Sequence, residues 1–406
     1  MTAVMQGVRI LEVAEHTFVP AASALLADWG AEVIKVEHVE RGDAMRGLIK
    51  SSGLSFLESN VHVLLEHSNR GKQSIGLDLT TDDGLEILYK LAATCDVFLT
   101  NKMPSVRTKL HVDVEDIRAH NPNIIYVRGT GQGERGPDAD KGSYDSLAYW
   151  NRSGVAMGMK APESEHVPAP APAFGDSIGA MTIAGGIMGA LFHRERTGEA
   201  TTVDVSLLSV GMWSMGAGLA LSLQLGIPWG GGHMTPGSSG NPLMGNYTTK
   251  DSKQLSFACL QPMRYWPDAC ELIGRPELAA DERFADFEAL TANGPEAVEI
   301  LKAAFLERTA EEWAPRLAQF TGQWTWVQTT LEVVQDPQTI ANGYVADCAN
   351  SEGERFQLAT APVQYGGEPA QPKRAPKFNE HGDAILQALG IDWDTIVDLK
   401  VRGVVA

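Results

Sequence analysis

The chain has 406 residues, of which 44% are hydrophobic and 21% charged, so its composition is that of a globular protein long enough for two domains. Its formal net charge of -18 excludes a general nucleic-acid-binding protein, because no basic face could dominate the surface. A polyanionic ligand therefore needs a local basic pocket.

Predicted strands and helices alternate through the first third of the chain. A strand over 8–14, a helix over 20–29 and a strand over 32–37 form a βαβ unit. The pattern continues with strands over 74–79, 96–100 and 124–129 and helices over 82–93 and 114–120. This alternation predicts an α/β fold with a Rossmann-like open parallel sheet. The first βα turn, 15–20, lacks G-x-G-x-x-G, so NAD binding does not follow.

The second half predicts a smaller domain. A long helix over 176–196 is followed by a short strand over 202–206 and an apolar helix over 207–226. After a Gly/Ser/Pro-rich loop at 229–242, we predict a hairpin pairing 245–248 with 254–258 and then mostly helices over 261–320. The predicted organisation is a large domain built from 1–204 and 331–406, a linker helix over 205–227 and a small α+β domain over 228–330. Two short helices, 383–389 and 394–402, are expected near the C-terminus.

Three features bear on location. Cys95, Cys259, Cys270 and Cys348 show no C-x-x-C spacing, which suits a reducing cytoplasm and gives no metal signature. The N-terminal segment MTAVMQGVRI does not resemble a signal peptide. Residues 205–227 carry no charge and are long enough to span a membrane, but they contain several Ser and Gly and lack flanking Lys or Arg. We expect a buried helix of a soluble, cytoplasmic protein.

Asp176 is the most suggestive single residue, because it stands at the predicted start of a helix between Gly175 and Gly179. Free N–H groups and the helix dipole favour a carboxylate there, and the glycines would let a ligand approach the backbone. A partly desolvated carboxylate is competent for covalent catalysis. However, Asp is also among the best N-cap residues, so the segment alone leaves a purely structural role open.

Basic residues gather in a few loops despite the acidic total, and the carboxyl ends of parallel strands are where phosphates would meet them. Each, taken singly, is also compatible with a solvated surface charge. These residues are Arg41 and Arg46, Arg70 and Lys72, and Lys102, Arg107 and Lys109. The histidines carry less signal: His16 lies in the first βα turn, whereas His62 and His67 show no metal spacing with a third ligand. A serine hydrolase is disfavoured by the lack of G-x-S-x-G.

Several motifs in a fixed order point to one family. They are G-V-R-I-L-E-V-A at 7–14, W-G-A-E-V-I-K-V-E at 29–37, R-G-D at 41–43, K-Q-S-I-G-L-D-L at 72–79, G-D-S-I-G-A-M at 175–181, R-E-R-T-G-E-A at 194–200 and A-P-K-F-N-E-H-G-D-A-I-L at 375–386. The chain resembles the family III CoA-transferases, which include formyl-CoA transferase, the carnitine CoA-transferase and α-methylacyl-CoA racemase.

The resemblance implies a chemistry and an assembly. Asp176 matches the residue that forms acyl-anhydride and aspartyl-CoA intermediates. The substrates are then an acyl-CoA and a small carboxylic acid, with CoA as a substrate rather than a tightly bound cofactor, and with no metal. The family also implies an interlocked homodimer, which would give the charge-free 205–227 stretch a buried setting.

The resemblance also implies CoA-binding residues, position by position. Thr17 and Phe18 match the turn whose backbone lies near the thioester, and Tyr144 matches an active-site aromatic. The expected contacts near the adenosine and phosphates are His38, Leu77, Asp78, Leu79, Thr80, Asn101, Lys102, Met103 and Lys109. His38 replaces a frequent Arg, Lys102 replaces an aromatic, and Gly142 stands where formyl-CoA transferase has a lysine. The glycine-rich loop of some members corresponds to either 230–232 or 237–240.

Alternative functions make different demands. A racemase needs a second acid/base, in the family a His in a G-H-D-like motif, but this chain has Tyr144 within Gly142-Ser143-Tyr144-Asp145. A tyrosine hydroxyl ionises only well above neutral pH and is a poor base there. A non-catalytic partner subunit is disfavoured by the intact G-D-S segment. A hydrolase would need water to intercept the aspartyl intermediate, which a closed site suppresses. We therefore expect an acyl-CoA:carboxylate CoA-transferase.

Overall fold

The computed structural model describes residues 2–51, 61–230, 237 and 239–406, and the chain divides into two compact units. The first unit comprises Met1–Ala156, Ala169–Leu225 and Pro337–Ala406, and the second comprises Met157–Pro168 and Gly226–Asp336. Each unit has its own hydrophobic core.

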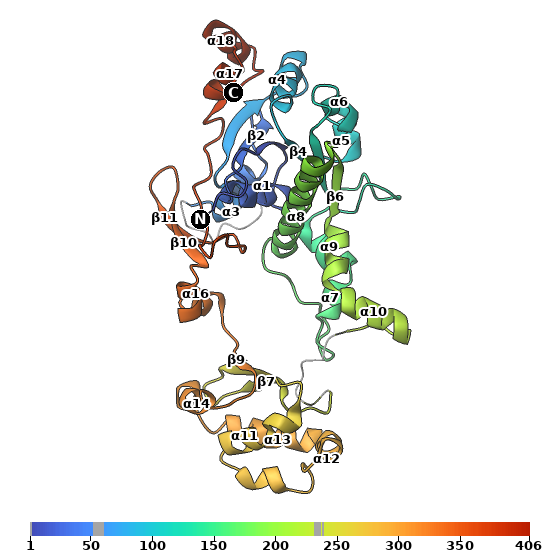
Figure 1. Ribbon diagram of the computed structural model, residues 1–406, viewed down its shortest axis with the longest axis vertical. Helices are drawn as coiled ribbons and strands as arrows, with labels where there is room; N and C mark the ends of the chain where they lie inside the picture. Colours follow the sequence, from blue (N-terminus) through green and yellow to red (C-terminus); the bar gives the residue numbers. More distant parts are fainter. Residues whose placement is uncertain (1, 52–60, 231–236, 238) are drawn as a thin grey trace. The chain divides into compact units, whose positions relative to one another are not determined.

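A six-stranded parallel sheet organises the first unit (Figure 1). Its strands are β1 (Arg9–Val13), β2 (Glu32–His38), β3 (Gln73–Leu77), β4 (Val97–Thr100), β5 (Ile125–Thr130) and β6 (Thr202–Ser206). They lie in the order β3-β2-β1-β4-β5-β6, and every pairing is parallel. The predicted Rossmann-like parallel sheet is thus confirmed.

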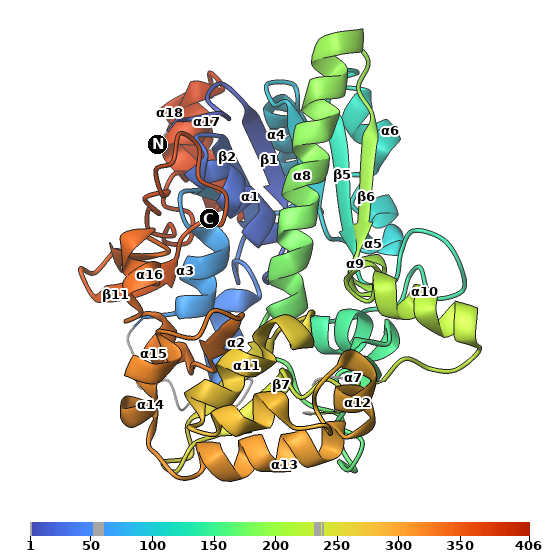
Figure 2. The same cartoon turned by 60° about the horizontal axis from the view of Figure 1, so that its bottom comes forward.

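Helices cover both faces of this sheet because successive side chains of a strand point to opposite sides. Ile10 and Val97 join the core beneath α1 (Phe18–Asp28) and α8 (Phe174–Thr197). Their neighbours Leu11 and Phe98 join the opposite core, which receives α4 (Asp82–Ala92) and the C-terminal helices α17 (Gly382–Ala388) and α18 (Trp393–Val401). Figure 2 shows α8 lying along the sheet, and α1 packs directly against it. The long N-terminal and C-terminal segments therefore build one unit.

Shorter elements complete the first unit. They are α2 (Met45–Ser51), α3 (Val63–Asn69), α5 (Pro104–Lys109), α6 (Val114–Arg118), a π-helix η1 (Ser146–Arg152), α16 (Pro337–Ala341) and the antiparallel hairpin of β10 (Val345–Ala349) and β11 (Arg355–Ala359). Of these elements only α6 was predicted, as a helix over 114–120. The short helix α7 (Val155–Gly158) lies where the chain passes from the first unit to the second.

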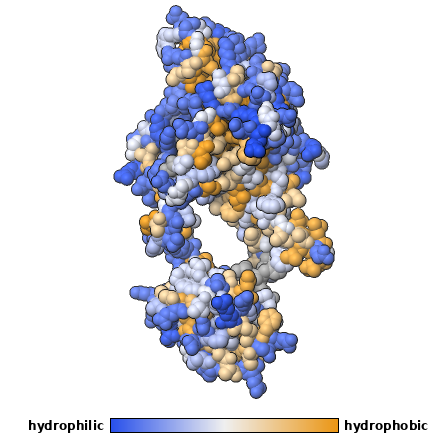
Figure 3. All heavy atoms as spheres, viewed as in Figure 1, coloured by the Kyte–Doolittle hydropathy of each residue, from blue (hydrophilic) through white to orange (hydrophobic). Residues whose placement is uncertain are grey.

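The prediction of a single apolar helix over 207–226 is wrong. The segment forms α9 (Leu207–Ser214) and α10 (Gly216–Leu225), which meet at a bend of 70°. No residue of α10 is buried in the single chain, and the side chains of Trp213 and Leu223 are 85% and 78% exposed. Figure 3 shows apolar side chains gathered over α10. The expected burial of this stretch is therefore not met within one chain.

Membrane-length helices are few in the described part of the chain. By length and composition alone, α8 is long and apolar enough to cross a membrane, as are α9 and α10 if they are counted as one bent span. In this structure α8 is a core helix that packs on α1 and β6.

The second unit combines a small sheet with helices. Strands β7 (Met244–Thr248) and β8 (Gln254–Ala258) form the predicted antiparallel hairpin, and β9 (Trp324–Trp326) adds a third, unpredicted strand. The helices are α11 (Pro262–Leu272), a 3-10 helix η2 (Pro276–Ala280), α12 (Phe287–Ala292), α13 (Gly294–Phe305), α14 (Ala310–Leu317) and α15 (Thr330–Val333). Most of the glycine-rich candidate at 230–232, and part of the one at 237–240, lies outside the described residues.

Candidate active site at the carboxyl edge of the sheet

The strand order reverses between β1 and β4, which is where ligands bind in open α/β sheets. Asn101, directly after β4, clamps the end of β1. Its side-chain amide donates to the Glu15 carbonyl at 2.7 Å, and its oxygen accepts from the Glu15 N–H at 3.2 Å. The two strand ends are fixed to each other, and so are the walls of the crevice between them.

Two adjoining clefts, of about 400 and 220 Å³, lie at this edge and share Glu15, Arg41, Lys102 and Val106. Predicted binding residues line both. In the larger cleft these are Asn101, Lys102, Met103 and Tyr144, and in the smaller one His38, Leu77, Asp78, Leu79 and Thr80, with Lys102 again. The fold therefore brings together predicted residues from the ends of β2, β3 and β4 and from a distant loop.

The charges in these clefts are partly neutralised. Glu15 forms an ion pair with Lys102 and lies 3.4 Å from the guanidinium of Arg41. Burial alone would raise the pKa of the Glu15 carboxyl, but Lys102 and Arg41 outweigh it and lower that pKa. Lys102 is thus tied to a carboxylate, whereas the side chain of Arg41 is 60% exposed and more available to a phosphate.

A buried ion network holds the first βα turn in place. Lys35 Nζ lies 2.7 Å from Glu12 and 2.8 Å from Asp43, and Lys72 Nζ lies 2.8 Å from Glu12. Asp43 Oδ1 in turn accepts the N–H of His16 at 3.0 Å. His16 has a φ of 69°, a left-handed conformation that few side-chain-bearing residues adopt without such support. Residues of the motifs at 29–37, 41–43 and 72–79 therefore stabilise the conformation of the first βα turn.

Four of the basic residues expected near phosphates have internal partners instead. Lys72 is buried in the network above. The other three pairs are Arg46 with Glu37 at 2.7 Å, Arg70 with Asp28 at 2.9 Å, and Arg107 with Glu134 at 2.6 Å. The alternative of a solvated surface charge is therefore wrong for Arg70, Lys72 and Arg107, because their side chains are at most 2% exposed and pair with carboxylates of the fold. Lys109 is exposed at the end of α5 and lines neither cleft, so its phosphate contact stays a prediction.

The glycines beside Asp176 accommodate the protein's own aromatic rings. A Cβ at Gly179 would lie 2.4 Å from the ring of Phe18, and one at Gly175 would lie 2.2 Å from the ring of Tyr149. The space into which a side chain would project from these two glycines is therefore filled by the protein itself. Thr17 and Phe18 are buried and line neither of the two clefts, so their place near the thioester stays a prediction.

Asp176 lies in the first turn of α8 but is not its N-cap. The cap residue is Ala173, which is left-handed with a φ of 58° and makes no side-chain capping bond. Burial, and then the nearby charge of Asp145, raise the pKa of the Asp176 carboxyl to about 7. A cap role does not account for a carboxylate placed in this way, whereas a perturbed pKa at a helix N-terminus is typical of functional groups.

Two further residues near Asp176 were missed in the sequence. Asp145 accepts the backbone N–H of Gly175 at 3.1 Å, although only its neighbour Tyr144 was weighed in that stretch. His67 Nε2 lies 3.5 Å from Ser177 Oγ, and Ser177 Oγ donates to the Ala173 carbonyl at 2.8 Å. Burial lowers the pKa of His67 to about 4, so its ring is neutral near pH 7. The G-S-Y-D stretch offered a signal for Asp145, but no motif pointed to His67.

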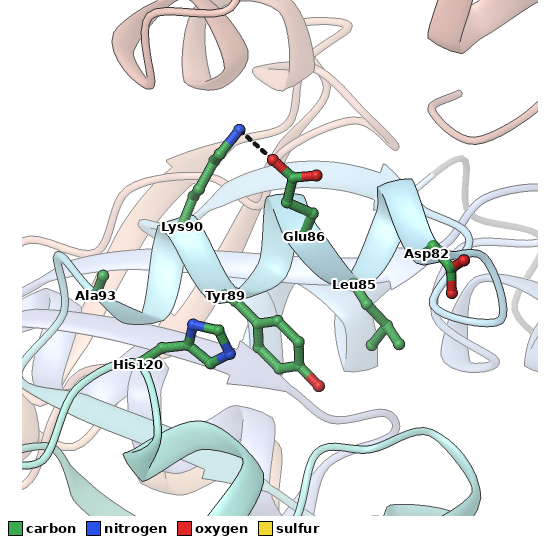
Figure 4. Close-up of a pocket in the computed structure, with 7 residues that line it drawn as sticks. All are labelled: Asp82, Leu85, Glu86, Tyr89, Lys90, Ala93 and His120. Atoms are coloured by element: carbon green, nitrogen blue, oxygen red, sulfur yellow. Dashed lines mark ion pairs between the residues drawn. The ribbon is translucent and has the colours of Figure 1, made fainter.

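Another hollow, of about 410 Å³, lies on α4 and shares no lining residue with the two clefts (Figure 4). The rings of Tyr89 and His120 stack there at 4.1 Å, and Lys90 pairs with Glu86 at 2.7 Å. These groups satisfy one another and suggest no chemistry. Within the described residues, no three His, Cys, Asp or Glu side chains gather in a way that could hold a metal.

Comparison with known proteins matches the profile described as CoA-transferase family III to residues 5–382. The chain belongs to this family. A (R)-2-hydroxy-4-methylpentanoate CoA-transferase of Clostridioides difficile is 29% identical to this CoA-transferase over 99% of each chain. A succinyl-CoA:glutarate CoA-transferase of Mus musculus is 29% identical over 99% of this chain and 90% of the relative. A crystal structure of a CAIB/BAIF family protein from Brucella suis, 28% identical, has a TM-score of 0.81 and covers 96% of this chain and all of its own.

Proposed function

We propose that this CoA-transferase moves CoA from an acyl-CoA thioester to a small carboxylic acid through a covalent intermediate on Asp176. The observation that carries the proposal is a half-buried carboxylate, not used as a cap, whose pKa is raised to about 7 in the first turn of α8. A more basic carboxylate is a better nucleophile, and desolvation adds to this effect. The named relatives are CoA-transferases that act on different acids, which supports a carboxylate acceptor.

The proposed chemistry needs no ATP, because the thioester already stores the energy. An Asp176 oxygen attacks the thioester carbonyl carbon, the C–S bond breaks, and CoA leaves as a thiolate. The thiolate then attacks the Asp176 carbonyl of the mixed anhydride and releases the donor acid, which leaves an aspartyl-CoA thioester. The acceptor carboxylate repeats both steps in reverse order and restores the free Asp176 carboxylate.

The two clefts at the sheet edge are the proposed CoA site. Arg41 and Lys141 place cations on their walls for the phosphates, and Lys102 adds a third that Glu15 partly neutralises. Such local cations are needed because the overall charge of -18 repels a polyanion. The smaller cleft, lined by His38 and by Leu77 to Thr80, has a mixed apolar and polar surface suited to the adenosine.

We also propose the interlocked homodimer that the resemblance implies. The exposed apolar side chains of α9 and α10, among them Trp213 and Leu223, support a protein-covered surface there.

The test combines a substrate panel with one variant. Acyl-CoA donors are incubated with carboxylic acids without ATP, and the products are identified by mass spectrometry. We expect CoA exchange in the wild type and a loss of several orders of magnitude in Asp176→Asn. Proton exchange at the α-carbon of a 2-methylacyl-CoA, without CoA exchange, would instead establish a racemase. CoA exchange only after a second protein is added would indicate a partner subunit.

A further inference from the structure

The N-terminus of α8 lacks a capping side chain of its own, although its first N–H groups have no partner within the helix. The N-cap Ala173 has no polar side chain. Asp145, 30 residues before Gly175, supplies the missing acceptor through its Oδ2 atom at 3.1 Å. A distant carboxylate thus fixes the backbone immediately before Asp176.

The fit between these two segments is tight. Asp145 is 9% exposed, and its Oδ1 atom has no hydrogen-bond partner among the described residues. That oxygen would lie 2.5 Å from a Cβ at position 175, so any residue larger than glycine would push the two segments apart. A buried oxygen left without a partner is costly, and a capping role alone does not account for it.

We propose that Asp145 is a positioning residue of the transfer reaction. It fixes the backbone next to Asp176, and it favours the acylated form of the Asp176 side chain over the free carboxylate. The inference rests on the proposed function. Two carboxylates near one helix N-terminus repel each other when both are ionised. Acylation converts Asp176 from an anion into a neutral anhydride or thioester, so it removes this repulsion.

The charge balance of the first half-reaction supports this role. One negative charge leaves Asp176 and appears on the CoA thiolate sulfur, and no proton is transferred. The Asp145 charge therefore raises the energy of the free enzyme more than that of the covalent intermediates. Burial acts in the same direction, because it penalises the free carboxylate.

Few other titratable groups face this turn among the described residues. From α3, His67 approaches through Ser177, and its ring is neutral near pH 7. From η1, Tyr149 packs against Phe174 and donates to Ser214 at 3.1 Å. From α1, Phe18 contributes only an apolar ring. Among these groups, Asp145 is the one whose charge raises the pKa of Asp176.

The decisive variant is Asp145→Asn, which keeps an acceptor oxygen and removes the charge. Its matched control is Glu195→Gln, the same loss of charge at an exposed position near the far end of α8. We expect Asp145→Asn to fold normally, to keep the KM for acyl-CoA within about twofold, and to lower kcat about tenfold, the equivalent of one pKa unit. The apparent pKa of the rate profile should fall by about one unit, and the acyl-enzyme trapped at equilibrium should decrease in proportion.

The outcomes are distinguishable from a failure of the proposed function. If Asp176→Asn abolishes transfer while Asp145→Asn matches Glu195→Gln in kcat, rate profile and trapped intermediate, Asp145 is only a cap and the inference fails. If Asp176→Asn itself retains turnover, the proposed function fails first. Should Asp145→Asn unfold, the same pH profile measured on Asp145→Glu, which keeps the charge, should stay like that of the wild type. An apparent pKa shifted downward there overturns the inference.

Discussion

The ring of Phe18 occupies the space that a side chain at Gly179 would need, since a Cβ there would lie 2.4 Å from a ring carbon. This contact sets how closely α1 and α8 approach, and α8 carries Asp176 one turn earlier. The position of Asp176, the proposed nucleophile, thus depends on residue 179 being a glycine, because the methyl group of an alanine there would collide with Phe18.

Gly179→Ala should destabilise the protein by about 1–3 kcal/mol and reduce transfer, because the added methyl must push apart two packed helices. Gly189→Ala on the same helix is the control, since nothing lies within 4 Å of a Cβ there. It should stabilise the protein by roughly 0.5–1 kcal/mol through the helix preference of alanine. Urea unfolding of both variants checks the prediction, and equal stabilities would contradict it.

The free energy of unfolding of Asp176→Asn should exceed that of the wild type increasingly as the pH rises. The folded-state pKa of Asp176 is about 7, above its ordinary value, so this group's favourable contribution is complete in acid and is lost as the pH rises toward and through 7. Between pH 5.5 and 8.5 the gap should widen by about 1–4 kcal/mol, since one pKa unit is worth about 1.4 kcal/mol. A constant gap would show that the pKa is ordinary.

CoA transfer by the wild type should rise with pH and level off above about pH 7, because only ionised Asp176 attacks the thioester. The rate with saturating acyl-CoA, measured from pH 5.5 to 8.5 at constant ionic strength, gives the apparent pKa. A flat profile over this range would contradict the assignment of Asp176 as a nucleophile with a raised pKa.

Glu15→Gln should lower the KM for acyl-CoA about two- to fivefold with little change in kcat, because Lys102 and Arg41 then face the phosphates without a competing carboxylate. Arg41→Met should raise the KM and weaken its dependence on salt. Lys90→Met, on α4 away from both clefts, is the control and should change neither. If Glu15→Gln raises the KM instead, the pair serves the fold of the site rather than competing with the substrate.

The protein should sediment as a dimer that does not dissociate on dilution, because α9 and α10 expose an apolar surface in the single chain. Leu223→Asp should weaken that dimer. Val401→Asp, equally exposed on α18, should leave it intact. A stable, monodisperse wild-type monomer would exclude the proposed assembly.

The parallel sheet could be predicted from the sequence because its signals are local. Alternating strands and helices, with Pro20 inside α1 and Gly30 after it, define βαβ units without any long-range information. The break between α9 and α10 was not predicted, although Ser214 and Gly216 flank Met215 and Ser and Gly residues are among the known causes of sharp helix kinks.

The candidate site was predictable only where a motif named it. Asp176 and the residues at the strand ends were found through the resemblance and through the rule for ligands of open sheets. The charge of Lys72 suggested a phosphate ligand, yet its side chain is fully buried against Glu12. The sequence shows that a lysine is present, but it does not show that the carboxylate of Glu12, 60 residues away, forms an ion pair with it. Asp145 was missed for the same reason, because its partner is a backbone N–H of a distant helix.

The buried ion network around Lys35 stabilises the fold whether or not the protein is catalytically active. Replacing one residue of this network leaves an unpaired charge in the core, which typically lowers the free energy of unfolding by about 3–5 kcal/mol. Folding alone therefore constrains these residues. A descendant that had lost Asp176 would still be obliged to keep Lys35, Glu12 and Asp43. A protein that shares these buried residues therefore shares the fold. Only the residues around the first turn of α8 indicate whether it is also an enzyme of this kind.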